Sequence, residues 1–211
     1  MSQAEGRYHH GNLREALLEQ AHALLVEEGI DGVSLRQVAA RAGVSRTAPY
    51  HHFDSKEALL AALVQRGWEQ LVSAMAPSAM DDGPVMARFR EVGRAYIAFA
   101  LREPPVYRIM CGSKMLDPDR HPEAVCAADR AFDLCLGLVS EGQRRGEIGG
   151  EDPRAVAIGA WSMVHGLSSL LMDKLARSEL DVQDKSPLGD LDRDAVIEGV
   201  LDTLEYGLRA R

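Results

Sequence analysis

Cysteine is scarce in this sequence of 211 residues, which contains only Cys111, Cys126 and Cys135. Their spacing fits neither a disulfide framework nor a zinc site, so it excludes the disulfide-rich class and predicts a reduced protein. No run of about 18 apolar residues is present, which argues against a transmembrane helix. The first residues also lack the apolar core of a signal peptide. We therefore expect a cytoplasmic protein without a membrane partner.

An excess of basic residues is also absent. The net charge is −8, which argues against a protein whose whole surface attracts nucleic acid. Through residue 56 there are six Lys or Arg against seven Asp or Glu, together with five of the seven histidines, so the rest of the chain carries −7. Any surface that binds an anion must therefore be built from a few placed residues.

Alternating strand patterns are missing, and helical periodicity dominates, so we predict an all-α fold. Apolar residues spaced three and four apart mark a first helix that Asn12 caps and Gly29 ends. A longer helix follows at about 56–75, and Pro77 is expected to end it. Further helices are expected near 84–102, 104–115, 122–146, 153–176 and 193–209. Four of these begin where proline costs least, at Pro84, Pro104, Pro122 and Pro153.

Two short helices joined by Ala-Gly-Val-Ser at 42–45 form a helix-turn-helix pattern. Ser34 is the expected cap of the first of these two short helices, and Gly43 supplies the left-handed conformation at the turn between them. Ser45 is the expected cap of the second, whose N-terminus would then face an anion. This second helix should not extend past Phe53, which we assign to the core.

The side chains after the turn are suited to DNA. Arg46 can bind a guanine with two hydrogen bonds, and Thr47 can contact a thymine methyl or a phosphate. Tyr50 and His52 offer donors to phosphate oxygens. The candidate DNA-binding residues are Arg36, Ser45, Arg46, Thr47, Tyr50, His52 and Lys56.

Two features of this region leave alternatives open. Pro49 either shapes the short helix only or also touches a base methyl. Arg7, which precedes the first helix, either reaches DNA as an arm or belongs to a disordered terminus.

The segment 8–63, YHHGNLREALLEQAHALLVEEGIDGVSLRQVAARAGVSRTAPYHHFDSKEALLAAL, resembles the N-terminal DNA-binding domain of TetR-type (tetracycline-repressor-like) transcriptional regulators. The match includes the Tyr-x-His-Phe ending of the short helix and the Lys-Glu-x-Leu-Leu start of the next. This resemblance implies about nine helices, a homodimer, and a C-terminal domain that holds a small ligand and controls DNA binding. We place the DNA-binding domain at 1–56 and the helical ligand-binding and dimerisation domain at 57–211.

Trp161, His165 and Gly166 form a Trp-x-x-x-His-Gly motif that resembles the C-terminal motif of one subgroup of these regulators, supported by VYRIMCG at 106–112. Trp161 and His165 are neighbours on a helix, with Ser168 and Met172 on adjoining positions. These side chains either line a ligand pocket or only pack in the core. The candidate ligand-binding residues are Tyr107, Met110, Cys111, Trp161, His165, Ser168 and Met172.

The last two predicted helices suit dimerisation. The helix at 153–176 is apolar on more than one side, and the helix at 193–209 adds a second apolar face. Two such helices from each chain can pair across a two-fold axis as a four-helix interface.

Neither catalysis nor a metal or other cofactor is expected. His165 with Ser168 or Ser169 lacks the elbow, the oxyanion donor and the orienting carboxylate of a nucleophilic site. Adjacent histidines such as His51 and His52 point about 100° apart on a helix and cannot share one metal.

We expect a ligand-responsive regulator, a repressor that binds a palindromic operator as a homodimer and is released by an unidentified small molecule. The alternative is a helical protein-interaction module without sequence-specific DNA binding.

Overall fold

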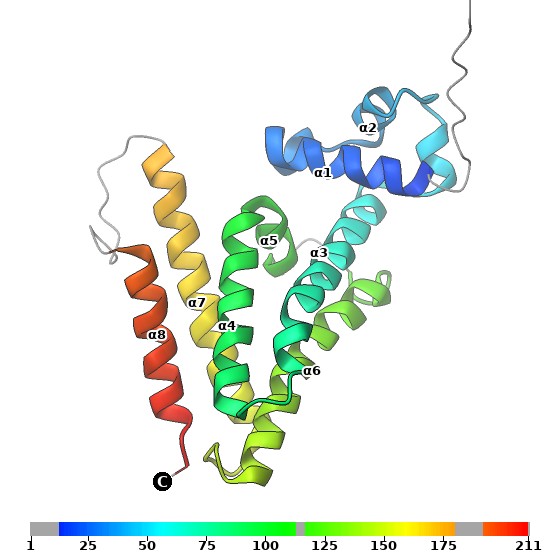
Figure 1. Cartoon of the computed structure of the whole chain (residues 1–211). Helices are drawn as coiled ribbons and strands as arrows, with labels where there is room; N and C mark the ends of the chain where they lie inside the picture. The colour runs from blue at the N-terminus through cyan, green and yellow to red at the C-terminus, as the bar shows by residue number, and fades with distance from the viewer. Residues whose placement is uncertain (1–12, 113–116, 180–191, 211) are drawn as a thin grey trace, which may run out of the picture. The chain divides into compact units, whose positions relative to one another are not determined.

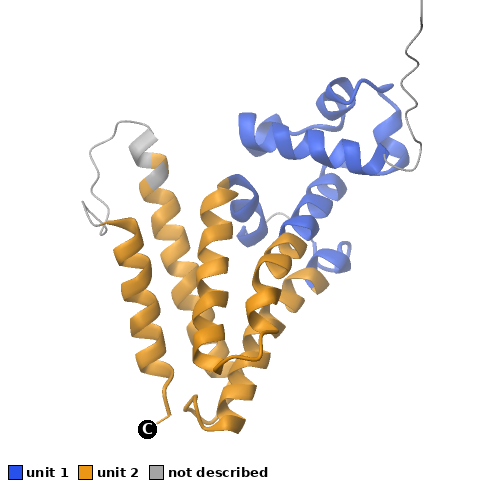
Figure 2. Cartoon of the chain, in the orientation of Figure 1, with its two compact units in different colours: residues 1–67, 105–125 blue, residues 68–104, 126–211 orange. Residues whose placement is uncertain are grey.

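A computed structural model describes residues 13–112, 117–179 and 192–210 of the chain (Figure 1). Within these residues the chain forms eight α-helices, one 3₁₀ helix and no β-strand, which confirms the all-α prediction. It divides into two compact units, unit 1 with residues 1–67 and 105–125, and unit 2 with residues 68–104 and 126–211 (Figure 2). The predicted Asn12 cap and the Arg7 arm lie outside the described residues.

The predicted helix-turn-helix is present in unit 1. α1 (Leu13–Gly32) is interrupted at Gly29, whose φ of 72° ends the regular helix where the sequence predicts. α2 (Leu35–Arg41) begins at Ser34, whose hydroxyl accepts a hydrogen bond from the Gln37 amide at 3.2 Å. Gly43 has a φ of 67°, the left-handed conformation that a residue without Cβ adopts at least cost. Both local predictions are therefore confirmed.

The segment after the turn differs from the predicted α-helix. It forms a turn from Ser45 to Ala48 and then a single 3₁₀ turn, η1 (Ala48–His51), which no side chain caps. The Ser45 hydroxyl lies 3.2 Å from the Thr47 hydroxyl, so its predicted role as a helix cap is wrong. Pro49 explains the difference, because it has no N–H with which to continue an α-helical ladder.

α3 (Lys56–Ala79) continues through Pro77, so the prediction that this proline ends the helix is wrong. Pro77 stands in the last turn, where it removes one backbone bond, and the Met80 amide still donates to Ala76 at 2.9 Å.

α5 (Pro104–Cys111) is shorter than predicted, and from Pro105 on it belongs to unit 1. It lies close to α3 at Gly67, where an added Cβ would come within 2.5 Å of the Met110 sulfur and 2.8 Å of Val106. A second contact joins this part of the chain to the start of α3, since Arg120 forms an ion pair with Glu57 at 2.7 Å. The segment after residue 104 is thus built onto the same unit as the helix-turn-helix.

Unit 2 is a helical bundle. It contains α4 (Val85–Arg102), most of α6 (Pro122–Arg145), α7 (Pro153–Glu179) and α8 (Arg193–Leu208), and α4, α7 and α8 pack against one another. As predicted, α5, α6 and α7 each begin at a proline, and Pro84 precedes α4 directly.

α7 overturns one expectation from the sequence. By length and composition, residues 153–174 are apolar enough to cross a membrane, although no such stretch was expected. Only 39% of the most apolar window is buried inside the structure. Core helices of water-soluble proteins pass the same test, and α7 packs on both α4 and α8. Part of its apolar surface nevertheless remains uncovered by the residues that the structure describes.

Ion pairs attach α8 to α4. Arg90 contacts Glu198 at 2.5 Å and Asp202 at 2.6 Å, and Arg94 contacts Glu198 at 2.6 Å. Glu198 is therefore shared by two guanidinium groups. Hydrogen bonds from Arg94 and Arg90 hold the pKa of the Glu198 carboxyl below its usual value.

Replacing Glu198 with glutamine should lower the melting temperature near neutral pH, because both arginines lose their shared anion. A carboxyl whose pKa is depressed stabilises the fold above its unfolded pKa, and this contribution is lost as the pH falls through the folded pKa. The difference between wild type and Glu198→Gln should therefore shrink as the pH falls below the usual value of 4.5. Thermal melts over a pH series test this. Glu91→Gln, which removes an ion pair within α4 only, is the control, and equal melting temperatures for the two variants would contradict the role of Glu198.

Candidate functional site

The predicted DNA-contacting residues lie on a segment that is exposed on one side and anchored on the other. Arg46, Thr47, Tyr50 and His52 are exposed. Within the same segment Pro49 is buried. Phe53, which follows it, is only 3% exposed and lies under the Arg14 guanidinium at 5.4 Å, as its assignment to the core predicts. The polar side chains therefore face solvent from a backbone that is held in place.

Burial of Pro49 also decides between its two proposed roles. A buried ring cannot meet a base methyl in this conformation, so Pro49 shapes the segment. Arg36, on the exposed side of α2, adds a second exposed arginine to the motif, and His51 is an exposed neighbour that the sequence pattern did not single out.

Lys56 has a structural role that the sequence did not reveal. Its ammonium group donates to the carbonyl oxygen of Ile30 at 2.8 Å, which joins the start of α3 to the last turn of α1. The hydroxyl of Ser55 accepts from the Ala58 amide at 3.1 Å and so caps α3. Because this lysine contact joins residues 26 apart, no local sequence pattern could have indicated it.

The candidate ligand-binding residues are divided between the two units. Tyr107 and Met110, on α5, are buried in unit 1, and Cys111 is half-buried beside them. Burial raises the pKa of the Cys111 thiol to about 11, which keeps it protonated and unreactive near neutral pH. The other four candidates lie on α7, in unit 2.

Trp161 is the centre of an aromatic cluster in unit 2. Its ring centroid lies 5.0 Å from that of Tyr96 and 5.9 Å from that of Phe132, both edge-on. It lies 6.3 Å from Trp68, whose ring is stacked at an interplanar angle of 28°. The Tyr96 hydroxyl is also 3.2 Å from Nδ1 of His165. Trp161 and His165 thus meet at Tyr96, as side chains four apart on a helix can.

Ser168 and Met172 continue the same face of α7 into the core. Ser168 is fully buried, and its hydroxyl donates to the Val164 carbonyl one turn earlier at 2.7 Å. Met172 is buried as well. Of the four predicted ligand-binding residues on α7, Trp161 and His165 therefore belong to the aromatic cluster, and Ser168 and Met172 belong to the core.

A small cavity lies beside Trp161. Its volume is about 20 Å³, room for about one water molecule. Residues from α3, α4, α6, α7 and α8 line it: Met75, Phe89, Val92, Gly93, Tyr96, Cys135, Ala160, Trp161, Val164 and Leu204. Burial raises the pKa of the Cys135 thiol to about 12. Of the predicted ligand-binding residues, Trp161 alone lines this cavity.

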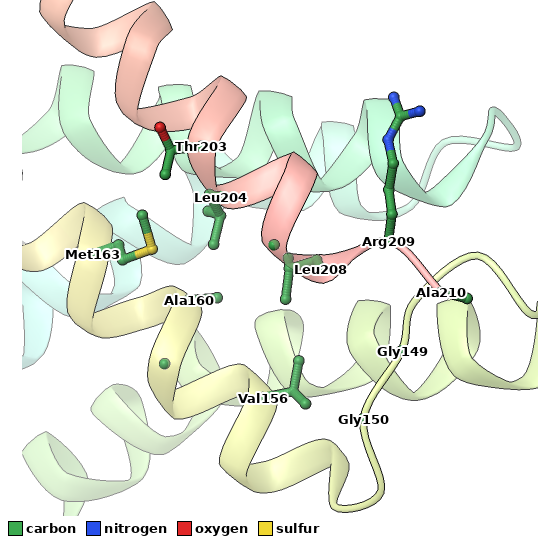
Figure 3. A pocket seen from close by; sticks show the side chains of 12 residues that line it. Gly149, Gly150, Val156, Ala160, Met163, Thr203, Leu204, Leu208, Arg209 and Ala210 are labelled. Atoms are coloured by element: carbon green, nitrogen blue, oxygen red, sulfur yellow. The ribbon is translucent and has the colours of Figure 1, made fainter.

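An open groove of about 700 Å³ is lined by both α7 and α8 (Figure 3). Val156, Ala160 and Met163 of α7 line it from one side, and Leu204 and Leu208 of α8 from the other. Both helices also carry glycines above which a Cβ would meet nothing within 4 Å, namely Gly159, Gly166, Gly199 and Gly207. Their neighbours include large exposed apolar side chains, Ile158, Leu170 and Tyr206.

Two family descriptions match the chain. The N-terminal one, "Bacterial regulatory proteins, tetR family", covers residues 17–63, and the other, "Tetracyclin repressor-like, C-terminal domain", covers residues 89–187. The chain belongs to the tetR family of bacterial regulatory proteins. Its N-terminal helix-turn-helix and its C-terminal helical domain are the two parts of this family, as the resemblance implies.

Several individual proteins are similar to this chain. A nucleoid occlusion factor, SlmA of Vibrio vulnificus, is 33% identical over 106 residues, which are 50% of this chain and 54% of that protein. The chain thus spans about half the length of the nucleoid occlusion factors it matches. A protein of unknown function from Rhodococcus sp. RHA1 is 35% identical, with a TM-score of 0.81 over 98% of this chain and 100% of that one. AibR in complex with isovaleryl coenzyme A and operator DNA shares the fold at 21% identity, with a TM-score of 0.68 over 92% of this chain and 98% of that one.

Replacing Lys56 with methionine should destabilise the chain by about 1–2 kcal/mol, because the Ile30 carbonyl loses a charged donor. Urea unfolding followed by circular dichroism measures the change. Arg46→Met, at an exposed position of the same motif, should stay within about 0.5 kcal/mol of wild type. Equal urea midpoints for Lys56→Met and Arg46→Met would contradict the structural role of Lys56.

Proposed function

We propose that the chain represses transcription by binding a palindromic operator as a homodimer and that a small molecule releases it. The observation that carries this proposal is the exposed polar side of the segment 45–52, held in place by the burial of Pro49 and Phe53. A surface of this kind lets an acidic chain bind DNA through a few residues.

Each exposed side chain has a proposed role. Arg46 and Thr47 read base edges in the major groove, with the Ser45 hydroxyl supporting Thr47 at 3.2 Å. Arg36, Tyr50 and His52 bind phosphates on either side. Lys56 contributes from the start of α3, where the helix N-terminus favours a phosphate. The functional boundary stays near residue 56, with α3 as the connection to 57–211.

The dimer is proposed to form through α7 and α8. The groove between them is lined by the open glycines Gly159 and Gly207, and the exposed Leu170 lies two turns beyond Met163 on the same stripe of α7, so a second copy can cover this surface. Glycines allow backbones to approach closely, and pairing two helices from each copy gives a four-helix interface. This also accounts for the apolar character of α7 that core packing leaves uncovered. A two-fold axis would set the recognition segments one turn of DNA apart, about 34–36 Å, or a multiple of that.

The effector is proposed to bind in unit 2 beside Trp161, so that Trp161 and His165 of the Trp-x-x-x-His-Gly motif take part. AibR, which shares the fold, was solved with an acyl coenzyme A and operator DNA, and this supports a small-molecule effector for this chain. The ligand shifts operator affinity only by the ratio of its own affinities for the two dimer states. We assign no catalytic role and no cofactor to the chain, and we place it in the cytoplasm with its DNA.

Arg46→Ala should weaken binding to the DNA upstream of the chain's own gene by about 5- to 150-fold, since one bidentate base contact is worth about 1–3 kcal/mol. Binding to a scrambled duplex should change much less. Electrophoretic mobility at one fixed low salt concentration measures both. Arg154→Ala removes an exposed arginine of α7 and serves as the control. An equal loss on both duplexes would contradict base reading by Arg46, and no shift of the promoter by the wild-type chain would favour the interaction module.

Leu170→Glu should turn the dimer into a monomer at micromolar concentration, because it buries a carboxylate in the α7–α8 interface. Leu170 is 42% exposed, and Val26 on α1, at 51%, provides a matched control. Sedimentation velocity should show a dimer for wild type and Val26→Glu and a monomer for Leu170→Glu. If the Leu170→Glu chain remained dimeric, the dimer interface would have to lie on another surface.

A further inference from the structure

The cavity beside Trp161 offers an effector no charged partner. All ten lining residues belong to the described part of unit 2, and none of them is Asp, Glu, Lys, Arg or His. The hydroxyl that Tyr96 brings to the lining already lies 3.2 Å from Nδ1 of His165. Burying an unpaired charge in such surroundings costs several kcal/mol, whereas an apolar group gains free energy on leaving water.

Trp161 differs from the rest of the lining. The other nine residues are buried, and Trp161 is half-buried. Because the cavity holds only about 20 Å³, any larger molecule must displace part of its wall. The half-buried indole is the most exposed part of the wall, so a molecule that enters from solvent meets it first.

A displaced Trp161 would act on α3. The indole of Trp161 is stacked on Trp68, which is 8% exposed and lies on α3. α3 is the helix that begins at Lys56, directly after the recognition segment, and contributes residues 56–67 to unit 1. A change in the stacking of the two indoles therefore alters the packing of the helix that leads into the DNA-binding region.

We propose that this cavity takes an uncharged, mainly apolar group, an alkyl chain or a ring, and that Trp161 is the side chain that moves to admit it. The proposal rests on the proposed function, because the cavity is taken as the effector site. It adds the chemical class of the ligand and the residue that senses it. Tyr96 belongs to the lining and its hydroxyl lies 3.2 Å from Nδ1 of His165, so a neutral polar end of the ligand can exchange a hydrogen bond with the Tyr96 hydroxyl.

Three probes with the same six-carbon chain test the ligand class on the full chain: hexan-1-ol, hexanoate and hexylammonium. Thermal shift titrations near neutral pH should give an apparent affinity for hexan-1-ol at least about tenfold higher than for either ion. In a Trp68→Phe chain, whose only tryptophan is Trp161, hexan-1-ol should also change the emission spectrum. Equal or tighter binding of an ion, no binding of hexan-1-ol, or an unchanged Trp161 spectrum on binding would overturn the proposal.

A matched pair of variants tests the position of the site. Cys135→Phe fills the cavity from α6, whereas Cys126→Phe adds the same ring at an exposed position of the same helix. Hexan-1-ol should no longer stabilise Cys135→Phe and should stabilise Cys126→Phe as it does wild type. Cys135→Leu, which adds less volume, replaces the first variant if circular dichroism shows that Cys135→Phe does not fold. Equal binding of hexan-1-ol by Cys135→Phe and Cys126→Phe would overturn the proposed position of the site.

Mobility shift of the promoter DNA, measured without any probe on the same wild-type preparation, separates this proposal from the proposed function. Retained DNA binding with failed hexan-1-ol binding refutes the ligand class alone. Loss of DNA binding refutes the proposed function itself.

Discussion

The burial of Pro49 and Phe53 is the constraint on which DNA recognition by this chain depends. The recognition segment, residues 45–52, is a turn followed by one 3₁₀ turn, too short to be stable by its own hydrogen bonds, and Pro49 removes a donor from it. Its conformation must therefore come from packing, which the two buried rings provide. This packing leaves Arg46, Thr47, Tyr50 and His52 on the outside of a fixed backbone. The ordering cost is met in folding, so it does not weaken DNA binding.

The contacts around the segment serve the same end. Lys56 joins α3 to the end of α1, and Ser34 and Gly43 set the limits of α2. Few cations are exposed in the motif, and the whole chain is acidic. Specific binding then has to come from placement of side chains and from pairing of two copies, not from bulk attraction. A dimer doubles the number of placed contacts with DNA, while the net charge of each chain stays the same.

α7 serves an aromatic cluster, the core and an exposed side at once. One face carries Trp161 and His165 to the aromatic cluster and continues through Ser168 and Met172 into the core, and the opposite side exposes Leu170. Such a helix is apolar nearly all round, which is why it passes a composition test for membrane helices. In the proposed regulator, ligand sensing and dimerisation share this helix, and they need no long relay between them.

Local features of the fold could be predicted from the sequence, whereas contacts between distant segments could not. The Ser34 cap, the left-handed Gly43 and the prolines at helix starts depend on a few adjacent residues, and all are observed. Pro77 misled the prediction because a proline in the last turn removes only one bond. The role of Lys56 and the contacts of Trp161 with Trp68, Tyr96 and Phe132 arise from tertiary packing, for which no local pattern exists. For the same reason the sequence grouped Tyr107 with Trp161, although the two lie in different units.

The salt dependence of DNA binding tests most directly whether a few placed residues bind the DNA. Fluorescence anisotropy of labelled promoter and scrambled duplexes over a series of salt concentrations gives the slope of log affinity against log salt. Arg36, Arg46 and Lys56 are the cations proposed to contact DNA in each copy, and the exposed Arg41 is paired with Glu27. A dimer should therefore show a slope no steeper than about −5, with clear preference for the promoter. A much steeper slope with equal affinity for both duplexes would mean diffuse electrostatic binding and would contradict recognition by a few placed residues.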